Sequence, residues 1–129
     1  MNKILLVEDD PSESRLYKRL LDLEGFEVMA IDNGQDSRNS ALEFHPDVIL
    51  MDIMMPKMNG FDALDILHFN EELNKIPVIV FTNLSDHHYE EEALKRGAVR
   101  FVTKSQIENK NLVRMIREVI EAYKQKGMV

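Results

Sequence analysis

The fold is decided near the start of the chain, by the stretch KILLVEDDP at residues 3–11. Its first half is a short, continuous apolar run, which is typical of a strand buried on both faces of a parallel sheet. Its second half places three acids directly after that run, followed by Pro11, a residue that suits the first turn of a helix. The stretch therefore predicts a buried β-strand that leads through an acidic turn into a helix.

The same pattern recurs along the whole chain. Buried strands are predicted at Lys3–Val7, Glu27–Ile31, Val48–Met51, Val78–Phe81 and Val99–Val102. Helices are predicted at Pro11–Glu24, Gln35–Phe44, Phe61–Phe69, Ser85–Arg96 and Glu108–Lys124. Because parallel neighbours need crossover connections, this alternation predicts a doubly wound α/β fold: a five-stranded parallel sheet with helices on both faces.

Apolar spacing predicts which side of the terminal helices faces the sheet. The first helix is expected to pack through Leu16, Leu20 and Leu23, and the last through Leu112, Ile116, Val119 and Ile120. The second helix has a thin apolar face and weak helix formers, so it is expected to be short or mobile.

Composition limits the possible functions. The 129 residues fit one domain, at 1–129, and 44% hydrophobic with 30% charged residues is typical of a globular protein. A formal net charge of -7 disfavours direct binding to nucleic acid. The absence of cysteine excludes thiolate metal sites and cysteine nucleophiles. The first apolar run is too short for a signal peptide or a membrane span, so a cytoplasmic protein without a membrane anchor is expected.

Polar residues at the strand ends predict the site. These residues are Glu8, Asp9 and Asp10 after the first strand, Asp52 after the third, Thr82 at the fourth and Lys104 at the fifth. Carboxyl ends of parallel strands share one edge, where such sheets bind ligands. Crowded carboxylates need a cation, and oxygen ligands favour Mg²⁺, with Mn²⁺ as a substitute. With this metal, Asp52 can attack a phosphoryl group while Lys104 and Thr82 meet its oxygens.

Four segments together resemble the receiver domain of bacterial response regulators, over essentially the whole chain. They are ILLVEDD at 4–10, DIMMPKMNG at 52–60, Phe81-Thr82 and Val102-Thr103-Lys104. The resemblance implies a flavodoxin-like receiver fold with strand order 2-1-3-4-5. It also implies a phosphorylation-activated switch of a two-component (phosphorelay) system, and a phosphoacceptor rather than an enzyme.

The resemblance also implies roles for individual residues. Asp52 accepts a phosphoryl group from a histidine kinase or histidine phosphotransfer protein, and an unidentified downstream protein reads the altered surface around the fourth helix, fifth strand and fifth helix. The Mg²⁺ ligands are Glu8, Asp9, Asp52 and the backbone carbonyl of Met54, with Asp10 just outside. Thr82 and Lys104 bind the phosphoryl group, and Thr82 moves with Phe101 as the switch. Pro56 and Gly60 shape the loop after Asp52.

The chain departs from the family pattern at several positions. Ser105 follows Lys104 where the family usually has a cis proline, so we expect a trans peptide with Lys104 still reaching the site. Asn83 replaces a small residue, and it is expected to narrow access to Asp52 or to add a hydrogen-bond donor there. Met54 and Leu84 are apolar, and we hypothesise that they shield an acyl phosphate from water and slow its spontaneous loss.

Other readings stay open. One is a receiver-like interaction module that works without phosphate, and weaker ones are a small phosphohydrolase or a flavin-binding protein on the same fold. A haloacid-dehalogenase-type phosphatase would need a second Asp where Met54 stands, and a flavin site would need a phosphate-binding loop where the acids stand. No output domain follows Lys124, so either a separate effector or the removal of an output domain is expected.

Overall fold

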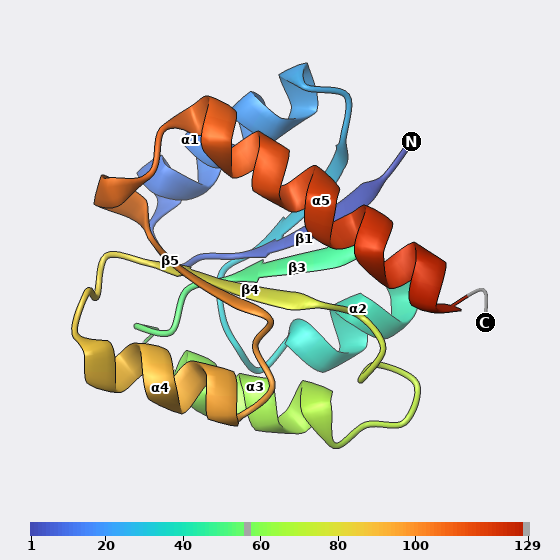
Figure 1. Cartoon of the computed structure of the whole chain (residues 1–129), viewed down its shortest axis with the longest axis vertical. Coiled ribbons are helices and arrows are strands. Elements are labelled where there is room, and N and C mark those ends of the chain that lie inside the picture. Colours follow the sequence, from blue (N-terminus) through green and yellow to red (C-terminus); the bar gives the residue numbers. More distant parts are fainter. Residues whose placement is uncertain (56–57, 128–129) are drawn as a thin grey trace.

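The computed structural model describes residues 1–55 and 58–127. It contains one parallel sheet with the strand order β2-β1-β3-β4-β5, as the resemblance implied (Figure 1). The strands are β1 (Lys3–Val7), β2 (Glu27–Ile31), β3 (Val48–Met51), β4 (Val78–Thr82) and β5 (Arg100–Thr103). The fourth strand runs one residue further than predicted, and the fifth begins and ends one residue later.

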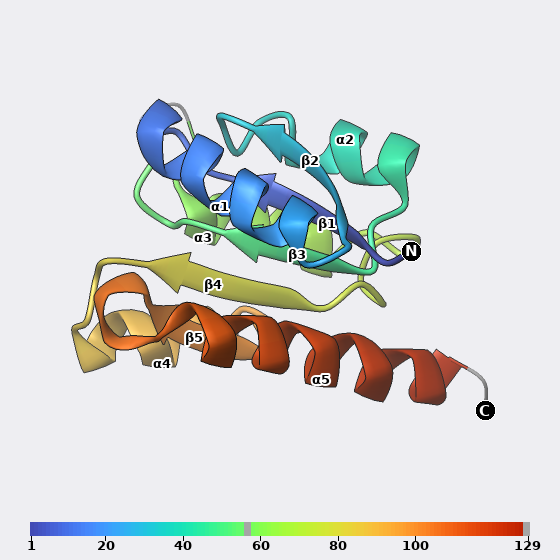
Figure 2. The same ribbon diagram turned by 90° about the horizontal axis from the view of Figure 1, so that it is seen from above.

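Helices cover both faces of the sheet, which confirms the doubly wound fold. They are α1 (Pro11–Leu23), α2 (Ser37–Phe44), α3 (Gly60–His68), α4 (His87–Lys95) and α5 (Asn109–Gly127), with a short 3₁₀ turn η1 (Lys104–Gln106) that was not predicted. Figures 1 and 2 show α1 and α5 on one face and α2, α3 and α4 on the other. The second helix is short, as expected. Within the described residues, no helix is long and apolar enough to cross a membrane.

The strands feed two separate cores, because successive side chains of a strand point to opposite faces. In β1, Ile4 and Leu6 pack with α1 and α5, whereas Leu5 and Val7 pack with α2, α3 and α4. All residues of β3 are buried. This double burial explains the continuous apolar runs of the sequence.

The packing face of α1 corrects one prediction. Leu16 and Leu23 are 60% and 78% exposed, whereas Leu21 is fully buried. Tyr17 packs against the same core and meets the ring of Phe81 edge-on at 4.8 Å. The buried stripe therefore runs one residue later than predicted, a rotation of about 100° around the helix. The prediction for α5 is confirmed, since Leu112, Ile116, Val119 and Ile120 are all buried.

Strand register positions the site. Val7 of β1 pairs with Met51 of β3, the last residues of two central strands. Glu8 and Asp52, which follow them, therefore lie side by side at the carboxyl edge of the sheet.

Candidate functional site

Three hydrogen bonds hold the side chain of Asp52. It follows β3 directly and is 8% exposed. Its Oδ1 accepts hydrogen bonds from Thr82 Oγ1 at 2.9 Å and from the backbone N–H of Met54 at 3.0 Å. Its Oδ2 accepts from Lys104 Nζ at 3.1 Å. The structure thus brings together the three residues that were predicted to carry the chemistry.

Lys104 lies at the centre of the site. The Lys104–Ser105 peptide is trans and the side chain still reaches Asp52, as expected. Nζ also donates to Glu8 Oε1 at 2.9 Å and to Glu13 Oε2 at 3.1 Å. A lysine ammonium has three donors. All three are engaged by carboxylates in this structure.

Three carboxylates gather around that ammonium. Glu8, Glu13 and Asp52 each place an oxygen within 4.8 Å of the others. The second oxygen of Glu8, Oε2, is buried and has no hydrogen-bond partner among the described residues. An unsatisfied buried carboxylate oxygen is costly, and a hard cation such as Mg²⁺ would satisfy it. The residues therefore fit a divalent metal.

The sequence did not single out Glu13. It belongs to the first turn of α1, three residues after the helix N-cap Asp10. A side chain at this position can turn back toward the cap, as in a capping box, and here that direction leads to the end of β1. The combination of an N-cap with an acid three residues later was the available signal.

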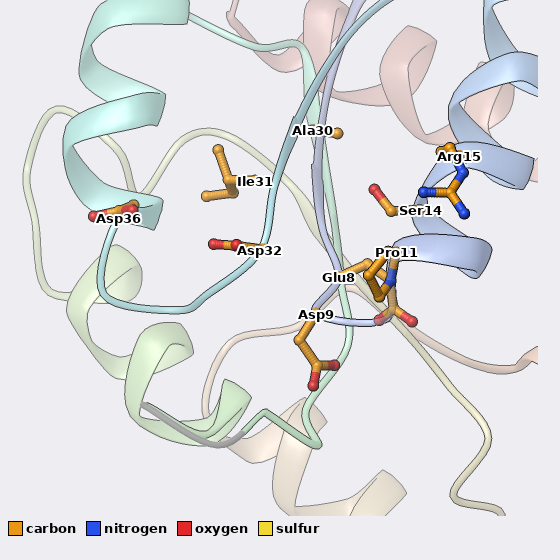
Figure 3. Close-up of a pocket in the computed structure, with 9 residues that line it drawn as sticks. All are labelled: Glu8, Asp9, Pro11, Ser14, Arg15, Ala30, Ile31, Asp32 and Asp36. Atoms are coloured by element: carbon orange, nitrogen blue, oxygen red, sulfur yellow. The ribbon is translucent and has the colours of Figure 1, made fainter.

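The other two acids after β1 have different placements. Asp10 accepts hydrogen bonds from the backbone N–H groups of Ser12 and Glu13 and so caps α1. Asp9 lines a hollow of about 520 Å³ together with Asp32, beside Glu8 (Figure 3). Within the described residues, Asp9 does not belong to the group of three carboxylates. Its role as a metal ligand stays a prediction.

Burial and hydrogen bonding perturb the charged groups. Burial, together with the neighbouring carboxyl groups of Asp52 and Glu13, raises the pKa of Glu8 to about 9. Burial alone would also raise the pKa of Asp52, but its interaction with Glu8, the hydrogen bond from the Met54 amide and the charge of Lys104 lower it. Burial works against the charge of Lys104, yet hydrogen bonding to Glu8 and the nearby carboxylates raise its pKa. The surroundings therefore favour the ionised form of Asp52 and the protonated form of Glu8.

The flanking residues differ in how closely they cover Asp52. Met54 is 60% exposed, whereas Leu84 is half-buried and its backbone N–H lies 3.4 Å from Thr82 Oγ1. Asn83 is exposed. Phe101 of β5 is half-buried and packs on the same core as Leu84. Side-chain shielding and the coupling of Thr82 to Phe101 stay predictions.

The loop after Asp52 requires a glycine at position 60. The Gly60 backbone N–H donates to the carbonyl of Ile53 at 3.0 Å. A Cβ on Gly60 would lie 2.6 Å from Ile53 Cγ2 and 2.8 Å from the carbonyl oxygen of Asp52. Only a residue without a side chain fits here. The predicted contribution of Pro56 lies outside the described residues.

Fold and site together define a class: a (βα)₅ domain with an acidic edge, a strand-end Asp and a lysine that reaches it. Comparison with known proteins agrees, because residues 4–117 match the family model of the response regulator receiver domain. The chain therefore belongs to the response regulator receiver domain family.

Individual relatives support this assignment. The chain is 36% identical over 104 residues to the regulatory protein AtoC of Escherichia coli. The matched residues make up 81% of this chain but only 22% of AtoC. It is 34% identical to the protein PilH of Pseudomonas aeruginosa, with 93% of this chain and 98% of PilH covered. Among solved structures, the receiver domain of a histidine kinase from Syntrophus aciditrophicus is 30% identical, with a TM-score of 0.85, over 95% of this chain and 92% of that one.

Proposed function

We propose that this chain is a phosphorylation-activated switch of a two-component system, and that Asp52 accepts the phosphoryl group. The observation that carries the proposal is the set of contacts to Asp52. Its ionised carboxylate is bound by Lys104 on one oxygen and by Thr82 on the other. A nucleophile with two donors beside it is arranged for transfer of a charged phosphoryl group.

The reaction needs positioning rather than a general base. An oxygen of Asp52 attacks the phosphorus, an O–P bond forms, and the P–N bond to a phosphohistidine of the donor breaks. The imidazole nitrogen keeps the electron pair. Lys104 and Thr82 then donate to the phosphoryl oxygens, whose negative charge they stabilise. The donor is a histidine kinase or a histidine phosphotransfer protein.

Mg²⁺ is the proposed cofactor, with Mn²⁺ as a substitute. Glu8, Asp52, the predicted ligand Asp9 and the backbone carbonyl of Met54 would hold it, and the unpartnered Oε2 of Glu8 supports this assignment. When bound, the metal supplies positive charge that neutralises the phosphoryl oxygens during transfer.

The output is a change in binding to another protein. In the present structure the Thr82 hydroxyl donates a hydrogen bond to the carboxylate of Asp52. A phosphoryl group on Asp52 would offer its oxygens as new acceptors and draw the hydroxyl toward them. We propose that Phe101 follows Thr82 and alters the surface formed by α4, β5 and α5. The chain then acts in the cytoplasm as a phosphoacceptor rather than as an enzyme with its own substrate, and without contact to nucleic acid or membrane.

Phosphorylation can be tested directly. The protein is incubated with Mg²⁺ and a small phosphodonor such as acetyl phosphate, and the adduct is measured by intact mass and its lability to acid and base. We expect one phosphoryl group in the wild type and none in Asp52→Asn. No adduct, or an adduct that survives the substitution, would contradict the proposal and favour a phosphorylation-independent module.

A further inference from the structure

Lys104 has no free donor for a phosphoryl group. Its Nζ is bound by Glu8 at 2.9 Å and by Glu13 and Asp52 at 3.1 Å each, and its side chain is 4% exposed. An ammonium group offers three hydrogens. If Lys104 is to bind a phosphoryl group on Asp52, at least one of these three contacts has to break.

Glu13 is the contact that breaks most easily. Glu8 and Asp52 are 3% and 10% exposed at their side chains, and they stay at the site as the proposed metal ligand and phosphoacceptor, so neither can move out into solvent when it leaves Lys104. Glu13 is 32% exposed and lies on the first turn of α1. Its carboxylate can therefore regain hydration when it leaves Lys104, at a much smaller cost.

We infer that Glu13 is a positioning residue that holds Lys104 in the unphosphorylated state and competes with the phosphoryl group for its ammonium. The inference rests on the proposed function and deepens it by naming a residue that regulates the same site. A contact made only in the resting state stabilises that state, so it must weaken binding of anything that requires its loss. The negative charge of Glu13 beside a phosphoryl group acts in the same direction.

The test measures the affinity for beryllofluoride, a non-covalent mimic of the phosphoryl group on Asp52. The variant Glu13→Gln keeps the size of the side chain and removes its charge, and Glu13→Ala removes the contact altogether. Affinity is followed by ¹⁹F NMR, with Mg²⁺ saturating for each variant. Partly exposed ion pairs of this kind correspond to an increase in affinity of up to about fivefold when the contact is lost.

A matched control is available on the same helix. Glu24 is the C-cap of α1 and pairs with Arg117 at 3.5 Å, at the opposite end from the site. Glu24→Gln makes the same change in charge, and we expect it to bind beryllofluoride as the wild type does.

A second measurement separates positioning from a general structural role. The Mg²⁺ affinity of Glu13→Gln is expected to stay equal or fall, because a negative charge near the site is lost, while beryllofluoride affinity rises. Loosening of the site would weaken both ligands. Equal or weaker beryllofluoride binding by Glu13→Gln and Glu13→Ala, or the same gain in Glu24→Gln, would overturn the inference. Failure of the wild type itself to bind beryllofluoride would instead overturn the proposed function, and this inference with it.

Discussion

Replacing Glu8 by Gln is expected to stabilise the metal-free protein and to flatten the dependence of its stability on pH. Glu8 is 3% exposed and its pKa is raised from 4.5 to about 9. Between those values the folded protein holds a proton that the unfolded chain releases. The free energy of unfolding therefore falls as pH rises, by up to about 1.4 kcal/mol per pH unit. The stability that the proton on Glu8 provides is fully present below pH 4.5 and is lost as pH rises to about 9.

The size of the effect follows from this difference. At pH 7 the protein has lost about 3 kcal/mol of this stability, because pH 7 lies about 2.5 units above the pKa of Glu8 in the unfolded chain. Gln is neutral at every pH and nearly the same shape, but its amide binds Lys104 less strongly than a carboxyl group that can ionise. We expect a net gain of about 1–2 kcal/mol, which raises the melting temperature by roughly 3–8 °C.

The assay is urea and thermal unfolding, followed by circular dichroism with a chelator present, across the range between the two pKa values. Glu118→Gln on the exposed side of α5 is the control for the loss of one carboxylate. Added Mg²⁺ should raise the melting temperature of the wild type more than that of Glu8→Gln. A Glu8→Gln protein that is less stable than the wild type at neutral pH, or whose stability has the same slope with pH, would refute the reasoning.

Substitutions at four further positions test other contacts. Lys104→Met leaves the buried carboxylates without their cation and should lower the free energy of unfolding by about 3 kcal/mol without Mg²⁺; an unchanged urea midpoint would contradict this. Gly60→Ala forces a methyl group against Ile53 and should lower the free energy of unfolding by at least about 2 kcal/mol. A melting temperature equal to that of the wild type would show that the loop shifts to accommodate the methyl group. Polar residues at Met54 and Leu84 should shorten the lifetime of the acyl phosphate several-fold, mainly through the half-buried Leu84. A rapid loss of phosphate that both substitutions leave unchanged would exclude shielding.

The sheet and the central site could be predicted because their signals are local. Each buried strand is a continuous apolar run, and the residues that follow it must lie at the carboxyl edge. Asp52, Thr82 and Lys104 are fixed in this way, one per strand end. The trans Lys104–Ser105 peptide was also predictable, because a cis bond without proline is costly.

The packing face of α1 could not be chosen from spacing alone. The sequence carries apolar pairs at 16–17 and 20–21, so two stripes about 100° apart fit equally well. The contact of Tyr17 with Phe81, which belongs to another element, decides between them. Glu13 was missed for a related reason: its contact with Lys104 joins residues 91 positions apart.

The shallow anchoring of α4 has a consequence for how the proposed switch can be observed. Ala93 is the buried residue of this nine-residue helix, whereas five large apolar side chains are buried in the part of α5 up to residue 124. Local opening costs less where little apolar surface is buried, so the amides of α4 should exchange with solvent deuterium well before those of α5. Hydrogen exchange in α4, recorded with and without a bound phosphoryl mimic, would then show coupling between Asp52 and α4 as a change in the protection of its amides.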